Sequence, residues 1–206
     1  MAVLITGASS GIGAAIVSRF LSDEELVIGV DIRPAPYCAI GYQHICADIR
    51  DPISIDPEDV HILINNAGIQ TTGVNQWEDI DVNLKALIDF TERYGLQPKI
   101  QAIVNIASTA AHNGAEFPVY AASKGGVLAY TKNVAQRVAQ FGATCNSISP
   151  GGVYTLLNKH IMDDPELMSR CYDETLLHKW ATPEEIADWV YFVSVNNKSM
   201  TGQDIL

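Results

Sequence analysis

The sequence predicts an α/β fold in which helices cover both faces of a parallel sheet. Short runs rich in Val and Ile alternate with longer segments in which apolar residues recur at helical spacing, and this alternation is typical of strand-helix-strand units. A glycine-rich turn directly after the first run supports the same fold class. With 206 residues, and about 150 residues expected per domain, the chain is predicted to form one domain, 1–206. No linker or repeat divides it.

The expected elements follow from these runs in chain order. Strands are expected at residues 2–6, 25–30, 44–47, 61–64, 101–106 and 143–149, and helices at 11–22, 80–94, 118–141 and 183–195. Thr182 is expected to cap the last helix, because Pro183 suits the first helical position and Glu185 completes a capping box. Residues 155–181 mix helical fragments with Pro165 and several charges. We interpret them as a lid, since they follow the sixth strand, where a ligand crevice is expected.

The charge balance excludes several classes of partner. The chain has 13 Lys and Arg against 24 Asp and Glu, a net charge of −11, so it is expected to repel nucleic acid. Its first residues lack a basic signal-peptide region, and no uncharged apolar run reaches the roughly 18 residues of a membrane span. We therefore expect a soluble, cytoplasmic protein with no membrane partner. The four cysteines and five histidines show no ligand spacing, so no metal site is expected.

A nucleotide-binding signal follows the first strand. The segment Thr6-Gly7-Ala8-Ser9-Ser10-Gly11-Ile12-Gly13 opens the first helix, and residues without a side chain let backbone N–H groups approach a pyrophosphate. Asp31 ends the second strand, 18 residues after Gly13, where a dinucleotide fold places the carboxylate that binds the adenosine ribose. NAD is expected as the cofactor and NADP is less favoured, because Asp31 would repel a 2′-phosphate. Arg33 partly offsets that charge.

Four polar residues are candidates for catalysis. Tyr120 and Lys124 lie four residues apart at helical spacing, so their side chains share one helix face. A phenol has a pKa of about 10, but a neighbouring ammonium and a cationic nicotinamide both favour the phenolate. Ser108 follows the fifth strand, at the sheet edge where such folds bind ligands. Asn83 has an amide that suits a water or a backbone group. Taken singly, each residue also fits a structural role.

Together these motifs resemble the short-chain dehydrogenase/reductase family nearly from end to end. The matching segments are Thr6-Gly7-x-x-x-Gly11-x-Gly13, Asp31, Asp48, Asn65-Asn66-Ala67-Gly68, Asn83, Ser108, Tyr120-x-x-x-Lys124, Pro150-Gly151 and Thr201-Gly202-Gln203. The resemblance implies a single Rossmann-like, doubly wound parallel sheet of six to seven strands in the order 3-2-1-4-5-6-7, with a short last strand. It also implies an NAD-dependent oxidoreductase that interconverts a small secondary alcohol and its ketone by hydride transfer.

The resemblance assigns a role to each candidate residue. Tyr120 is implied as the general acid/base, and Ser108 as the residue that orients and polarises the substrate oxygen. Lys124 is implied to bind the nicotinamide ribose and lower the pKa of Tyr120, while Asn83 holds a water of the proton relay. The implied cofactor contacts are Gly7, Ser10, Gly11, Ile12, Gly13, Asp31, Asp48, Ile49, Asn66, Ala67, Gly68, Tyr120, Lys124, Pro150, Gly151, Val153 and Thr155.

Two internal segments are shorter than the family pattern. Between Asp48 and Asn65 the usual helix is expected to be shortened or lost, because Pro52 and Pro57 lie in that short interval. The interval before Asn83 is about ten residues short, so its helix is expected to start late or to follow a trimmed loop. Such trimming would weaken cofactor binding.

A homodimer or homotetramer is expected. In many relatives the last strand and the helix before it form one interface, and the helices that hold Asn83 and Tyr120 form another. The second is expected here, since Ala121, Ala122 and Gly125 permit close helix approach. Packing of these small residues on the sheet is the alternative.

Two other functions stay open. An NADP-dependent 3-oxoacyl-carrier-protein-type reductase is disfavoured by Asp31 and by the net charge of −11, since carrier proteins are acidic. A non-catalytic dinucleotide-sensing scaffold would have no chemical need of Tyr120 or Lys124. The substrate pocket is expected at Gln70, Thr109, His112, Asn113, Tyr154 and the lid, and neither the substrate nor the reaction direction follows from these residues.

Overall fold

Alternating side chains of the first strand build the two halves of the core. In the computed structural model, which describes residues 1–114 and 117–206, β1 (Ala2–Thr6) sends Val3 and Ile5 to one face of the sheet and Leu4 to the other. All three side chains are fully buried. Because helices cover both faces, this strand is apolar on both sides rather than alternating with polar residues.

Seven parallel strands form one sheet in the order β3-β2-β1-β4-β5-β6-β7. After β1 they are β2 (Leu26–Asp31), β3 (Tyr42–Cys46), β4 (Ile62–Asn65), β5 (Ala102–Ile106), β6 (Thr144–Ile148) and β7 (Asp204–Ile205). The predicted fold class and strand order are confirmed. The six strands expected from the sequence lie within two residues of their predicted ends, and the last strand is short, pairing only Asp204 and Ile205 with β6.

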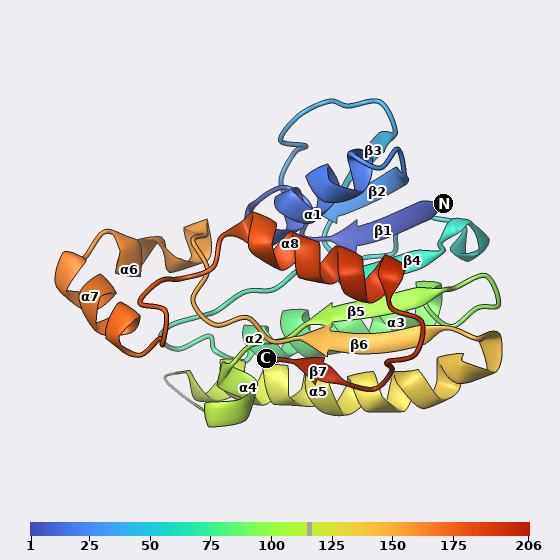
Figure 1. Ribbon diagram of the computed structural model, residues 1–206. Helices are drawn as coiled ribbons and strands as arrows, with labels where there is room; N and C mark the ends of the chain where they lie inside the picture. The colour runs from blue at the N-terminus through green and yellow to red at the C-terminus, as the bar shows by residue number, and fades with distance from the viewer. Residues whose placement is uncertain (115–116) are drawn as a thin grey trace.

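Helices cover both faces of this sheet (Figure 1). The α-helices of the described residues are α1 (Gly11–Leu21), α2 (Glu78–Ile80), α3 (Leu87–Tyr94), α4 (Ala110–Asn113), α5 (Pro118–Val138), α6 (Lys159–Met162), α7 (Pro165–Asp173) and α8 (Pro183–Tyr191). The helices α1 and α8 pack on the Val3 face through Ile16 and Val190. The helices α3 and α5 pack on the Leu4 face through Phe90 and Val134. The predicted capping box at the start of α8 is present, with Thr182 and Glu185 bonding each other's backbone N–H.

The segment predicted as a plain helix over residues 80–94 differs from that expectation. Helix begins at Glu78, passes through a π-helical stretch, Asp81–Ala86, and continues as α3. A π turn holds one more residue than an α turn and is common at functional sites, and apolar spacing gives no signal for it. A second π-helical stretch, Phe192–Asn196, follows α8. Between β3 and β4 a 3-10 turn, Pro57–Asp59, stands where the family helix was expected to be shortened or lost.

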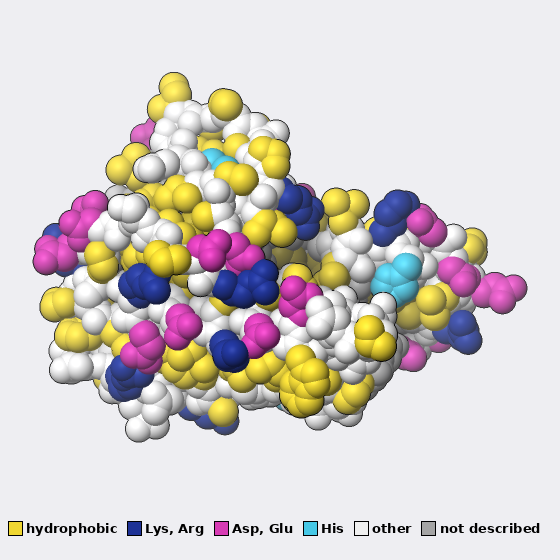
Figure 2. All heavy atoms as spheres, turned by 180° about the vertical axis from the view of Figure 1, so that it is seen from behind, with side chains coloured by type: hydrophobic (Ala, Val, Ile, Leu, Met, Phe, Trp, Pro, Cys, Tyr) yellow, Lys and Arg dark blue, Asp and Glu magenta, His cyan; other side chains and the backbone are white. Residues whose placement is uncertain are grey.

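Residues 155–181 form a lobe that leaves the sheet and returns to the same point. At its base Val153 and Ala181 form a parallel bridge, and the Ala181 N–H donates to the carbonyl of Gly152 at 3.0 Å. Figure 1 shows α6 and α7 of this lobe standing apart from the sheet. Figure 2 shows the opposite side of the molecule, where acidic and basic side chains are interspersed rather than separated into large patches of one charge. No helix among the described residues is long and apolar enough to span a membrane.

Candidate active site

The glycine turn after β1 is bonded to the end of β4. The Asn66 side-chain amide donates to the carbonyls of Thr6 at 3.0 Å and Gly7 at 3.1 Å. In return the Thr6 hydroxyl accepts the N–H groups of Asn66 and Ala67, each at 3.0 Å. Gly7 has φ +70, and a Cβ there would lie 2.8 Å from the Ala67 Cα. These contacts hold the two segments as one rigid edge.

The remaining glycines of the turn make room for close backbone approach. A Cβ on Gly13 would lie 1.9 Å from the Gly7 carbonyl oxygen, and one on Gly11 would lie 3.1 Å from the Thr155 Cγ2 atom. Ser10, the N-cap of α1, makes no capping bond with its own side chain. The first N–H groups of α1 therefore suit an anion at this helix end.

Asp31 is buried beside this turn, with an exposed fraction of 7%. One carboxylate oxygen accepts the Ser9 N–H at 2.9 Å and the other accepts the Arg33 N–H at 2.9 Å. Each oxygen has a further lone pair for a hydroxyl donor. The side chain is thus fixed in a position that suits recognition of a diol.

Asp48 belongs to an ion-paired group that was not predicted from the sequence. The Arg50 guanidinium donates to both Asp48 oxygens, at 3.0 Å and 2.6 Å, and this bond lowers the pKa of Asp48. Arg50 also lies 3.5 Å from Glu78 at the start of α2. The group connects the loop after β3 to α2, across the interval where only a 3-10 turn is present. Ile49 is partly buried and packs on the Leu4 side of the core.

Ser108, Tyr120 and Lys124 meet at the carboxyl end of β5. Tyr120 and Lys124 are one turn apart on α5, and the Ser108 side chain is near enough to the Tyr120 hydroxyl to influence its pKa. Burial raises the pKa of Tyr120, and the neighbouring Ser108 hydroxyl opposes that rise. Lys124 is 3% exposed and donates to the Ile106 carbonyl at 2.8 Å. Its Nζ atom is 5.8 Å from the centre of the Tyr120 ring, and burial lowers the pKa of Lys124 to about 8.

Asn83 joins this group from the π-helical stretch. Its amide accepts the Ile69 N–H at 2.8 Å and donates to the Ile69 carbonyl at 2.8 Å, so it binds a backbone group, one of the two partners expected for it. A Cβ on Gly68 would lie 3.2 Å from the Asn83 Oδ1 atom and 3.3 Å from the Lys124 Nζ atom. Gly68 thus lets the loop after β4 pass between the two side chains. All four candidate catalytic residues come together.

A buried carboxylate near this group was also missed. Asp79 of α2 has no exposed surface and accepts both the N–H and the hydroxyl of Thr71. Its negative charge raises the pKa of both Tyr120 and Lys124, although burial is the larger influence on each. Its position, four residues before Asn83, does not by itself indicate burial in the sequence.

Most of the predicted substrate-side residues follow β5 or β6, whereas Gln70 follows β4. The Pro150 carbonyl accepts the Thr109 N–H at 3.0 Å, and Val153 lies in the bridge at the base of the lobe. His112, weighed for the substrate pocket, bonds the Asp204 carboxylate of β7 at 2.8 Å. Asp204 also accepts the hydroxyls of Ser147 and Ser149. The pairing of His112 with the last strand was not predicted.

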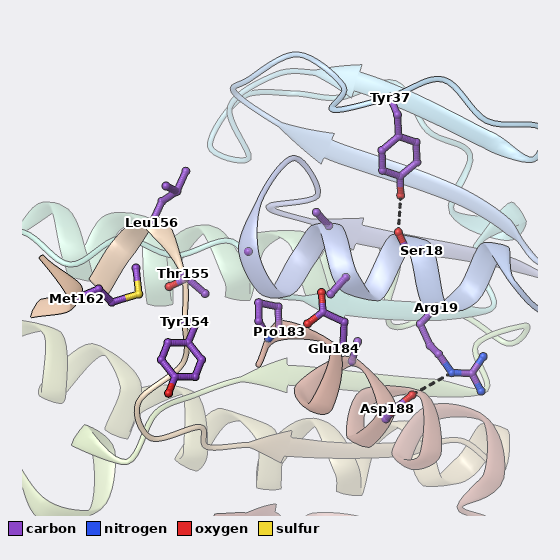
Figure 3. A pocket seen from close by; sticks show the side chains of 14 residues that line it. Ser18, Arg19, Tyr37, Tyr154, Thr155, Leu156, Met162, Pro183, Glu184 and Asp188 are labelled. Carbon is purple, nitrogen blue, oxygen red and sulfur yellow. Dashed lines mark hydrogen bonds and ion pairs between the residues drawn. The ribbon is translucent and has the colours of Figure 1, made fainter. Parts of the chain in front are cut away.

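A groove of about 640 Å³ lies along α1 and α8. Figure 3 shows Leu156 and Met162 of the lobe at one end and the Arg19–Asp188 ion pair at the other. Gly11 and Thr155 are the only predicted cofactor residues that line it, and none of the four candidate catalytic residues does. In the part of the chain that the structure describes, no group of three His, Cys, Asp or Glu side chains is arranged to hold a metal.

Comparisons with known proteins agree with this geometry. The family model described as short chain dehydrogenase matches residues 1–166. The 2-(R)-hydroxypropyl-CoM dehydrogenase of Xanthobacter autotrophicus is 29% identical, over 93% of this chain and 90% of the relative. The 3-oxoacyl-acyl-carrier-protein reductase of Vibrio harveyi is 29% identical, over 93% and 88%. The solved structure of a 4-hydroxyisoleucine dehydrogenase mutant complexed with NADH and succinate has a TM-score of 0.87 and 27% identity, and the match covers 100% of this chain and 96% of that one.

Proposed function

The chain belongs to the short-chain dehydrogenase family of oxidoreductases, which act on CH–OH groups, and on this premise we propose that it interconverts a small secondary alcohol and its ketone with NAD. The observation that carries the proposal is the meeting of Ser108, Tyr120 and Lys124 at one edge of the sheet, next to the glycine turn. Similarity to dehydrogenases supports the reaction class, and the position of Asp31 supports the choice of cofactor.

The residues present fit a nicotinamide dinucleotide. Gly7 and Gly13 stand where a Cβ would collide with neighbouring backbone, so the turn packs tightly against the chain. The first N–H groups of α1, which the Ser10 side chain does not cap, suit a pyrophosphate. Asp31 would bind the adenosine ribose. The remaining contacts that we propose are Ser10, Gly11, Ile12, Asp48, Ile49, Asn66, Ala67, Gly68, Tyr120, Lys124, Pro150, Gly151, Val153 and Thr155. When bound, the cofactor supplies hydride chemistry at its nicotinamide ring.

The chain's own groups would handle the proton and orient the substrate. Tyr120 would accept the hydroxyl proton during oxidation of the alcohol and return it to the carbonyl oxygen during reduction. Ser108, which lies near the Tyr120 hydroxyl and influences its pKa, would share the substrate oxygen and polarise it. The Lys124 ammonium would favour the phenolate form of Tyr120 and bind the nicotinamide ribose. Asn83 would hold the Ile69 backbone and a water of the proton relay.

The lobe of residues 155–181 would act as the lid over the substrate. Its two ends meet at the Val153–Ala181 bridge, so the segment between them extends from one fixed base. Tyr154 at that base and Tyr172 of α7 share a hydroxyl hydrogen bond of 2.8 Å. This bond fixes the lobe close to the loop after β6, where Pro150 and Thr155 are proposed to contact the cofactor.

A homodimer or homotetramer through α5 is part of the proposal. Ala122 and Ala129 are exposed on this helix, and a Cβ on Gly125 would meet nothing within 4 Å. Gly126 instead packs inside the protomer, because a Cβ there would lie 2.6 Å from Leu84. Ala122 and Ala129 are therefore the part of this face that we propose contacts a second subunit.

Cofactor choice gives the first test. Fluorescence titration is expected to give micromolar binding of NADH and at least about tenfold weaker binding of NADPH, since the Asp31 carboxylate repels a 2′-phosphate. Asp31→Ser is expected to remove most of that difference. Asp51→Asn is the matched control, because it removes one exposed carboxylate from the same chain and is expected to keep the preference.

Other outcomes would change the proposal. Preference for NADPH in the native protein would favour the carrier-protein-type reductase, the alternative that similarity to the Vibrio harveyi enzyme supports. If neither nucleotide binds, the trimmed segments have removed the cofactor site, and the roles given to Tyr120 and Lys124 are withdrawn.

A further inference from the structure

We propose that Asp79 is a positioning residue of the active site, which anchors the loop after β4 and provides the buried counter-charge of the Lys124 ammonium. The importance of that ammonium for catalysis rests on the proposed function. The influence of the Asp79 charge on Lys124 depends only on the arrangement of α2 and α5.

Hydrogen bonds alone do not compensate the buried negative charge of Asp79. The side chain has no exposed surface, and its Oδ1 atom accepts the N–H of Thr71 at 2.9 Å and also the Thr71 hydroxyl. The buried Oδ2 atom accepts no hydrogen bond from any described residue. A buried carboxylate is costly unless a nearby cation balances it. Such a cation must come from a neighbouring element.

Lys124 is a buried positive charge whose hydrogen-bond partner is neutral. It is 3% exposed, and its ammonium donates to one neutral partner, the Ile106 carbonyl. The helices α2 and α5 pack against each other, and Asp79 is the acidic residue whose charge acts on Lys124. Burial lowers the pKa of Lys124 to about 8, and the charge of Asp79 opposes that fall.

The other ionisable groups near Lys124 do not act as its counter-charge. Tyr120, on the same helix, is the proposed acid/base, and burial raises its pKa. Glu78 and Asp81 flank Asp79 in sequence but pair with Arg50 at 3.5 Å and with Lys85 at 2.7 Å. Of the acidic residues on this stretch, Asp79 alone is buried.

The same side chain also helps to place the cofactor loop. Asp79 and Asn83 lie four residues apart, and they hold Thr71 and Ile69 respectively, two alternate residues of the loop after Gly68. These bonds keep Gly68 beside the Lys124 ammonium. In a chain with a short interval between Gly68 and Asn83, one stretch of helix supplies both the loop anchor and the counter-charge.

The test measures the Lys124 pKa directly, by NMR titration of protein labelled with ¹³C at lysine Cε. The chain has seven lysines, and Lys124→Met assigns the signal. Asp79→Asn retains an oxygen that can accept both Thr71 bonds but removes the charge, so the Lys124 midpoint is expected to fall by about one pH unit or more. Thr71→Val is the matched control: it removes one hydrogen bond to Asp79, keeps the charge, and is expected to leave the midpoint in place.

An unchanged midpoint in Asp79→Asn would overturn the proposal. Asp79→Ser provides a second neutral variant if the first fails to fold by circular dichroism. The native titration is a test by itself, because a fully buried lysine without a counter-charge titrates at about 5–6, and a native midpoint in that range also overturns the proposal. Titration of the same native sample with NADH and NADPH separates the two claims. Absence of nucleotide binding contradicts the proposed function. The influence of the Asp79 charge on Lys124 is then judged from the Lys124 titration midpoints alone.

Discussion

Tyr120→Phe is expected to lower kcat by about 10²- to 10⁴-fold, the range that a positioned general acid/base contributes, and to retain NADH binding. The substitution removes only the hydroxyl beside Ser108, and the ring continues to fill its site on α5. Initial rates with an accepted substrate, together with a fluorescence titration of NADH, measure the two effects separately.

Tyr130→Phe is the matched control for this change. Tyr130 lies on the same helix, and its hydroxyl bonds Glu92 at 2.9 Å outside the proposed site. Its loss is expected to leave kcat near the native value. Full activity in Tyr120→Phe would mean that another group moves the proton. No measurable turnover in the native protein, with cofactor binding intact, would favour the non-catalytic scaffold.

Gly13→Ala is expected to have the largest effect on stability and on cofactor binding. The new Cβ would lie 1.9 Å from the Gly7 carbonyl oxygen and 2.6 Å from the Asn66 amide nitrogen, so the turn must move. We expect a loss of about 3 kcal/mol in the free energy of unfolding and loss of NADH binding. Urea denaturation and fluorescence titration measure these quantities.

Gly125→Ala is the comparison, because this glycine also lies in a helix but a Cβ there meets nothing within 4 Å. It is expected to raise the free energy of unfolding by about 0.5–1 kcal/mol, since alanine favours the helix. Denaturation at several protein concentrations separates this gain from any change in self-association. Equal stability of the two variants would mean that the turn relaxes around an extra methyl group and does not require glycine at position 13.

Most of the fold could be predicted because its signals are local. Buried strands such as Ile62–Asn65 contain continuous apolar runs, and the capping box of Thr182 and Glu185 lies within four residues. The catalytic group could also be predicted, since Tyr120 and Lys124 share a helix face and Ser108 follows a strand. Sequence spacing encodes these relationships directly.

The unpredicted features depend on contacts between distant segments. The Asp48–Arg50 pair is local, but its link to Glu78 at the start of α2 depends on how the trimmed segments pack. His112 bonds Asp204, which lies 92 residues later in the chain. Asp79 looks like a surface acid in the sequence, and only the packing of α2 against α5 makes it a buried charge. Such partners follow from the tertiary structure and not from hydropathy.

Hydride transfer is the central claim, and isotope transfer tests it most directly. The protein is incubated with NADH that carries deuterium at both C4 positions and with a panel of small ketones, and the product alcohols are analysed by mass spectrometry. One deuterium at the carbinol carbon is expected with the native protein, and strongly reduced incorporation with Tyr120→Phe. Saturating cofactor binding without deuterium in any product, across hydroxy-acid, sugar, diol and sterol precursors, would contradict the account.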